Sequence, residues 1–157
     1  MRRDHFELEV HNVDWVESGE PPAEPRVVID FTGPEETLTD RLTGADGDLL
    51  DASETDVTFR LQDPLDSSDA TGVVSVTDRI TGDFLLELNE DADDVLRFVR
   101  AAREYGQTTD DDGGRYSVVI RVDGDTVATY AKSTFLVYDA NGSLLRSKSL
   151  IPSGVEL

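Results

Sequence analysis

Alternating hydrophobic and polar positions recur along most of the chain, a pattern that predicts half-buried β-strands. The first example is FELEV (residues 6–10), and VTFRL (residues 57–61) repeats the same alternation. Residues 37–42 fit either one helical turn or an edge strand, because Leu38 and Leu42 suit both. Similar apolar runs predict further strands at residues 26–31, 72–78 and 83–89.

One segment instead has the period of an α-helix, at residues 91–105. Its apolar residues follow the i, i+3, i+4, i+7 spacing of a single buried stripe, and the acidic residues of its first turn suit the helix dipole. Gly106 is a natural residue with which to end such a helix. The stripe consists of Val95, Phe98, Val99, Ala102 and Tyr105. A helix with one apolar face has to pack on another element, which we expect to be a sheet.

The C-terminal third predicts a β-hairpin in which RYSVVIRV and DTVATYAK are joined by the turn Asp123-Gly124. The register that pairs Val122 with Asp125 separates the apolar from the polar positions, and a one-residue slip would mix them. This register places Arg115, Ser117, Arg121, Tyr130 and Lys132 on an outer face. It places Tyr116, Val118, Ile120, Val122, Val127 and Ala131 on the inner face.

A second hairpin is predicted at residues 136–151, with a type I turn and a glycine bulge at residues 139–142. Its register sets Phe135 and Val137 against Leu145 and Ser147 on the inner face. Leu136 and Tyr138 then share the outer face with Arg146 and Lys148.

Many short strands with one helix predict an α+β fold, built from a mainly antiparallel sheet of about eight strands. The alternative is a β-sandwich capped by the helix. The length of 157 residues suits a single domain spanning residues 1–157.

The charge of the chain indicates the salt concentration in which the protein is stable. There are 34 acidic against 14 basic residues, for a formal net charge of −20, and only two of the bases are lysines. Self-repulsion at this charge destabilises a compact state in dilute salt, whereas at about 1 M salt the Debye length falls to about 3 Å. We therefore expect a protein that requires strong salt and is surrounded by solvent cations.

This composition resembles that of cytoplasmic proteins of halophilic archaea. The run DRITGDFLLELNEDADDVLRFVRAAREYG (residues 78–106) also resembles a family of small haloarchaeal proteins of unknown function, which implies no catalytic residues. The N-terminal MRRDHFELEV lacks the apolar region of a signal peptide, and no apolar run approaches the length of a membrane span. We expect a cytoplasmic protein that does not enter the membrane.

The chain offers little catalytic or metal-binding chemistry. It has no cysteine, and His5 and His11 lie about 20 Å apart on one strand at about 3.3 Å per residue, too far to share an ion. Neither a glycine-rich phosphate loop nor a G-x-S-x-G elbow is present. We therefore assign no catalytic, cofactor-binding or metal-binding residue, and an enzyme is not the favoured interpretation.

The acidic run Asp-Asp-Asp-Gly-Gly at residues 110–114 is a separate case. A calcium loop needs alternating ligands whose oxygens converge, whereas consecutive side chains in an extended segment point to opposite sides. We interpret the run as a solvated hinge between the helix and the next strand.

The distribution of charge suggests where the chain binds a partner. Residues 1–114 carry a formal net charge of −21, whereas residues 115–157 carry +1. Aromatic residues and arginine are enriched at interface cores, where acidic residues are depleted. The predicted partner-binding residues are Arg115, Arg121, Tyr130, Lys132, Leu136, Tyr138, Arg146 and Lys148.

We therefore predict a non-enzymatic protein-interaction module that uses the outer face of its C-terminal strands, with another protein or a second copy as partner. Nucleic acid is an unlikely partner, because the acidic body repels phosphate. The alternative is a small-ligand-binding protein or an enzyme with a pocket between the helix 91–105 and the sheet.

Overall fold

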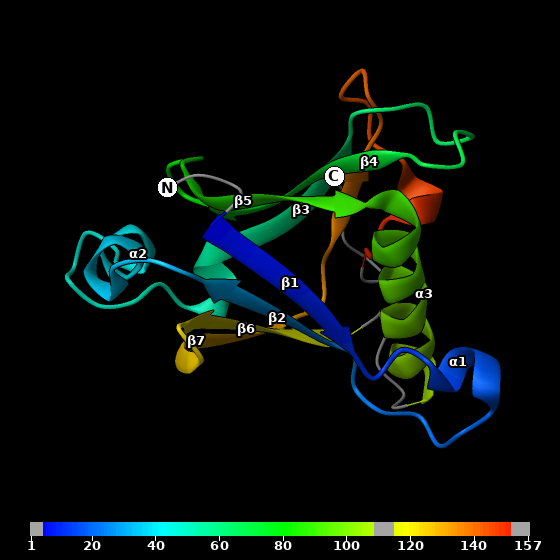
Figure 1. Cartoon of the computed structure of the whole chain (residues 1–157), viewed down its shortest axis with the longest axis horizontal. Helices are drawn as coiled ribbons and strands as arrows, with labels where there is room; N and C mark the ends of the chain where they lie inside the picture. The colour runs from blue at the N-terminus through cyan, green and yellow to red at the C-terminus, as the bar shows by residue number, and fades with distance from the viewer. Residues whose placement is uncertain (1–4, 109–114, 152–157) are drawn as a thin grey trace.

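The computed structural model describes residues 5–108 and 115–151. One sheet, here called the first sheet, contains β1 (Phe6–His11), β2 (Arg26–Phe31), β6 (Tyr116–Val122) and β7 (Asp125–Lys132), in that order. The second sheet contains β5 (Phe84–Asp91), β4 (Thr71–Asp78), β3 (Thr55–Leu61) and β8 (Leu136–Tyr138), in that order. The two sheets face each other across the core (Figure 1).

The α+β class is confirmed, and the eight strands of the described residues form two mixed sheets. Four of the six strand pairings are antiparallel, and the pairs β2–β6 and β3–β8 are parallel. The alternative layout, a sandwich closed by the helix, is therefore nearer to the structure than one continuous sheet.

Helices close the open sides between the sheets (Figure 1). The long helix α3 (Ala92–Thr108) lies along one side, and α2 (Glu35–Leu42) lies on the other. Residues 37–42 are thus helical, and Leu38 and Leu42 are both fully buried. The shorter helices are α1 (Trp15–Ser18) and the 3-10 helices η2 (Ala52–Glu54) and η3 (Arg146–Lys148). Within the described ranges, no helix combines the length and the apolar character needed to cross a membrane.

The predicted helix 91–105 is confirmed, but it is longer than expected. The helix continues to Thr108, and Gly106 is a buried residue inside it rather than its terminator. The buried stripe contains Val95, Phe98 and Val99 as predicted, whereas Tyr105 is only half-buried.

The core joins both sheets and α3 through three aromatic rings. Phe98 of α3 packs edge-on against Tyr116 of the first sheet with ring centroids 5.3 Å apart, and Tyr116 lies 5.9 Å from Phe135. The fully buried Tyr116 hydroxyl donates a hydrogen bond of 2.6 Å to the carbonyl oxygen of Thr134. Burial raises the pKa of Tyr116 well above its ordinary value, so this hydroxyl remains a donor at neutral pH.

The first predicted hairpin is present, but its faces differ from the prediction. Val122 pairs with Asp125 as expected, yet the register shifts by one residue between Ile120 and Arg121, so that Val127 is an unpaired bulge residue. From there on, Tyr130 pairs with Val118 and Lys132 with Tyr116. Because paired residues share a face, the bulge turns Tyr130 and Lys132 into the core.

The second predicted hairpin is only partly formed. The amide of Gly142 bonds to the carbonyl of Asp139 at 3.0 Å, and Gly142 has a φ of 85°, as a turn with a glycine bulge requires. The return arm pairs only at Leu144 and Leu150. Between these positions it forms the 3-10 helix η3, so Arg146 and Lys148 do not lie on a strand.

Candidate functional site

The eight predicted partner-binding residues do not form one face. The structure separates them into four places: the outer face and end of β6 (Arg115, Arg121), the core side of β7 (Tyr130, Lys132), the outer face of the second sheet (Leu136, Tyr138), and η3 (Arg146, Lys148). Whether any of them contacts a partner stays a prediction, but the shared basic and aromatic face that motivated the set is wrong.

Tyr130 and Lys132 are buried, with 4% and 6% of their surfaces exposed. The Lys132 ammonium donates hydrogen bonds to the carbonyl oxygens of Ala52, at 2.6 Å, and Thr55. Burial lowers the pKa of Lys132, and the charge of Arg79 adds to this effect. Lys132 therefore connects the first sheet to the start of β3 instead of facing solvent.

The two predicted partner-binding arginines at β6, Arg115 and Arg121, differ in their contacts. Arg115 forms an ion pair of 2.9 Å with Glu24, and its guanidinium lies 5.9 Å from the centre of the Tyr105 ring. Arg121 is half-buried opposite Asp30, and its Nε atom has no hydrogen-bond partner within the described ranges. These contacts favour a local structural role for Arg115.

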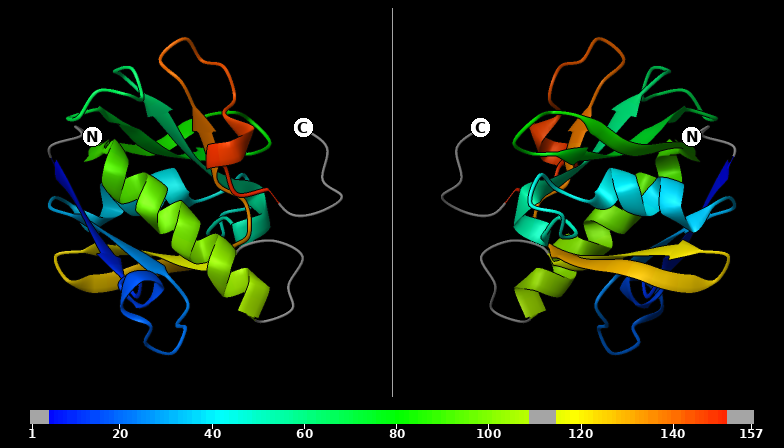
Figure 2. Two further views of the ribbon diagram at one scale, coloured as in Figure 1. Left: turned by 90° about the vertical axis from the view of Figure 1, so that its right-hand side faces the viewer. Right: turned by 90° about the vertical axis from the view of Figure 1, so that its left-hand side faces the viewer.

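The outer face of the second sheet carries a hollow with a volume of about 630 Å³. Cross-strand pairing sets Tyr138 beside Arg60, and Arg60 beside Val73. On the same face, Thr58 pairs with Ser75 on one side and with Leu136 on the other. Neither α2 nor α3 lies over this face, which points away from the first sheet (Figures 1 and 2).

An exposed phenylalanine completes this hollow. Phe84 pairs with Thr77, while Val76 pairs with Leu86, so Leu85 is an extra bulge residue in β5. The bulge lets Leu85 and Leu86 both reach the core and leaves Phe84 on the outer face, with 55% of its surface exposed. Sequence reasoning missed Phe84, although the unbroken apolar run Phe-Leu-Leu departs from strict alternation and is the signal of this bulge.

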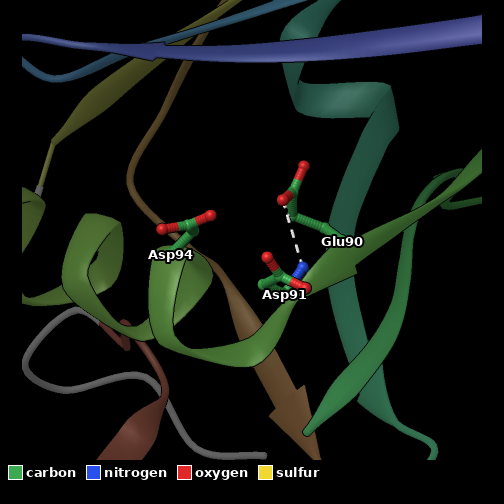
Figure 3. Close-up of side chains that lie close together, drawn as sticks. All are labelled: Glu90, Asp91 and Asp94. Carbon is green, nitrogen blue, oxygen red and sulfur yellow. Dashed lines mark hydrogen bonds between the residues drawn. The ribbon is translucent and has the colours of Figure 1, made fainter. Parts of the chain in front are cut away.

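Three carboxylates meet where β5 runs into α3. Each of Glu90, Asp91 and Asp94 offers an oxygen atom, and these atoms lie within 4.8 Å of one another (Figure 3). Burial raises the pKa of Glu90; its 3.1 Å hydrogen bond from the Asp91 amide opposes this rise, and the charges of Asp94 and Asp91 add to it. A calcium ion takes six to eight oxygen ligands, and we assign no ion to three carboxylates alone.

The alternative interpretation placed a pocket between the helix and the sheet, where the structure has a small apolar cavity. Its volume is about 20 Å³, and it lies between Leu8, Val27 and Phe98, with Glu90 and Asp94 among its lining residues. This volume accommodates about one water molecule, so the cavity has no room for an organic ligand.

Several charged residues of β1 and α3 form local pairs. His11 lies on β1 with its Nε2 atom 3.4 Å from a carboxylate oxygen of Glu9, a pair rather than a set of converging ligands. In α3, Arg97 forms ion pairs with Asp14 and Glu17, and Arg100 forms one with Glu104. The acidic run 110–114 lies outside the described residues.

Comparison with known proteins adds one match. The model of a family of unknown function matches residues 1–157. No curated protein and no solved structure matches the chain. The expected relation to a family of unknown function is thereby confirmed, while a haloarchaeal origin and a cytoplasmic location stay predictions.

Proposed function

The chain thus belongs to DUF5793, a family of unknown function, and we propose that it is a protein-interaction module that binds through the outer face of its second sheet. The observation that carries the proposal is the hollow of about 630 Å³ that contains Phe84, Tyr138 and Arg60. Large aromatic residues and arginine are the side chains that contribute most to protein interfaces. The partner is a polypeptide that covers these aromatic rings.

The charge of this surface supports the proposal. Of the residues that line the hollow, only Arg60 and Glu87 are charged, with opposite signs. The chain as a whole has a formal net charge of −20. A surface without net charge in so acidic a protein suits an interface core, from which charged residues are depleted.

Exposed apolar side chains extend the surface beyond the hollow. Ile80, at the tip of the β4–β5 hairpin, has 78% of its surface exposed, and Phe84 lies on the same hairpin. Apolar side chains exposed together mark interaction sites more often than isolated ones do. The hairpin therefore supplies one margin of the binding surface, and Tyr138 supplies the opposite one.

Site-specific photo-cross-linking tests this proposal. A photoreactive phenylalanine analogue replaces Phe84 or Tyr138 and, as a matched control, Thr129, which is exposed on the first sheet. In extracts of the source cells at multimolar salt, we expect adducts of one defined mass from positions 84 and 138 and none from position 129. Excess wild-type protein should abolish the adducts, whereas excess Phe84→Ser/Tyr138→Ser protein should not. Adducts from position 129 alone, or from none of the three, would contradict the proposal.

A further inference from the structure

A second hollow, separate from the proposed interface, lies on the side of α3 that faces away from the core. Its volume is about 350 Å³, and α1, α3 and η3 all contribute to its lining. Four basic residues face it, namely Arg97, Arg100, Arg103 and Lys148, with Glu17 as the one acidic residue. Such a concentration of positive charge contrasts with the formal net charge of −20 of the chain.

The geometry of α3 explains how three arginines reach one hollow. Residues three apart on a helix are displaced by about 4.5 Å along the axis and about 60° around it. Arg97, Arg100 and Arg103 therefore cover about 9 Å of the helix and about a third of its circumference. The three side chains remain on one broad face, between α1 and η3.

These positive charges are compensated to different degrees. Arg97 is neutralised by Asp14 and by Glu17, the latter at 3.4 Å. Arg103 instead donates from Nη2 to two uncharged acceptors, the carbonyl oxygens of Ser149 at 2.8 Å and Ser147 at 3.4 Å. These bonds hold the guanidinium in place without cancelling its charge. Among the described residues, the Nε and Nη1 atoms of Arg103 have no acceptor and can donate to a ligand.

The other two basic residues, Arg100 and Lys148, can contact a ligand because they are exposed to solvent. Arg100 has 62% of its side chain exposed, and its ion pair with Glu104 is long, at 3.7 Å. Lys148 is exposed and forms no ion pair with any described residue. An anionic group placed between Arg100, Arg103 and Lys148 would be next to three positive charges, one of which Glu104 partly offsets.

We infer that this hollow binds a small organic oxyanion with two or more negative charges, as a phosphate ester or a dicarboxylate has. Its charged group is held by Arg100, Arg103 and Lys148, and its apolar part lies on the half-buried Leu96 and Val16. The volume falls at the lower end of the range of small-molecule sites. In strong salt, long-range attraction is screened within a few ångströms, so direct bonds from arginine to the oxyanion supply the affinity. The inference is independent of the interface proposed on the second sheet.

Titration of the complete, isotope-labelled chain with inorganic pyrophosphate and, separately, with citrate tests the inference by NMR in multimolar potassium chloride. Both anions also stabilise proteins in general by being excluded from their surfaces, so a rise in melting temperature is not informative. We expect saturable amide shifts at residues 96–103 and 146–149. A response to pyrophosphate alone identifies a phosphate site, a response to citrate alone a carboxylate site, and a response to both a general oxyanion site.

Three variants test whether the anion binds in this hollow. Arg100→Gln and Lys148→Gln should each weaken binding about tenfold, because each removes one charged hydrogen bond. Arg146→Gln is the matched control: Arg146 lies on the same exposed turn as Lys148 but does not line the hollow. The absence of saturable shifts, or an equal loss of binding in Arg146→Gln, would overturn the inference.

Discussion

Two hairpins of this fold each contain a β-bulge, and the two bulges have opposite consequences for a nearby aromatic residue. In β7 the extra residue is Val127, and Tyr130 is turned into the core. In β5 the extra residue is Leu85, and Phe84 is left outside. One irregular residue in each strand thus decides which sheet presents an aromatic surface.

The comparison also explains why the exposed aromatic surface, where we propose that a partner binds, belongs to the second sheet. The first sheet uses Tyr130 and Lys132 for internal packing and hydrogen bonding. The second sheet fills the core with Leu85 and Leu86 and can therefore leave Phe84 exposed. One bulge thus places an aromatic side chain in the core, and the other leaves one exposed to solvent.

Truncating the two aromatic residues should separate these roles most strongly. Tyr130→Ala should lower the free energy of unfolding by about 3 kcal/mol, since it empties a buried position. Phe84→Ala should change it by less than about 1 kcal/mol, because the ring is largely exposed. Denaturant titrations in strong salt measure both values. An equal loss in the free energy of unfolding for both variants would contradict the different roles given to Tyr130 and Phe84.

The chain contains two lysines, which provide the next comparison. Lys132→Ala should cost about 2 kcal/mol, because the carbonyls of Ala52 and Thr55 lose their buried donor. Lys148→Ala should stay within about 0.5 kcal/mol of the wild type, as is usual for an exposed residue. The same denaturation experiment reports both, and a larger effect at Lys148 would speak against the inward position of Lys132.

The cost of Lys132→Ala should also depend on pH. Burial and the charge of Arg79 lower the pKa of Lys132 in the folded state below its ordinary value of 10.5, so the unfolded chain holds this proton more tightly. The stability that Lys132 contributes therefore rises as the pH rises toward 10.5 and is lost as the pH falls through the folded-state pKa.

The difference in the free energy of unfolding between wild type and Lys132→Ala should thus widen as the pH rises toward 10.5, by at most about 1.4 kcal/mol for each unit by which the pKa is lowered. Tyrosine ionisation affects the free energy of unfolding of both proteins, so it cancels when one value is subtracted from the other. A difference that narrows as the pH rises would show that the ammonium is not destabilised by burial.

Removing single hydroxyl groups gives the smallest effects. Tyr116→Phe should cost about 1 kcal/mol, because the bond to the Thr134 carbonyl is lost. Tyr130→Phe should leave stability unchanged or raise it slightly, since its hydroxyl is buried without a hydrogen-bond partner among the described residues. Thermal unfolding of both variants decides between these outcomes, and a clear loss in Tyr130→Phe would point to an uncounted partner for its hydroxyl.

Much of the fold was predictable because the relevant signals are local. Alternation identified the strands, and the apolar stripe identified the helix through Val95 and Phe98. The end of that helix was not predictable, because Gly106 is a buried residue inside the helix, where the tendency of glycine to terminate a helix is outweighed. The division into two sheets depends on the long-range parallel pairs β2–β6 and β3–β8, which have no local signal.

The candidate surface was predictable only in part, for the same physical reason. Tyr138 was correctly expected on an outer face, because the turn before Gly142 fixes its register. Its neighbour Arg60, and Phe84 at the opposite edge of the sheet, come from strands far away in the sequence. Tyr130 and Lys132 were misplaced because a bulge at Val127 reverses the alternation, and bulges are set by packing on both sides of a strand.

Central to this account is that β7 turns its aromatic and basic residues inward, so that the exposed aromatic surface belongs to the second sheet. Lysine labelling of the folded protein, read by peptide mass spectrometry in strong salt, tests this most directly because Lys132 and Lys148 are the only lysines. We predict rapid modification of Lys148 and strong protection of Lys132 until the protein unfolds. Modification of Lys132 as fast as Lys148 in the folded state would contradict the account, because it would return Lys132 to an outer face of the C-terminal hairpin.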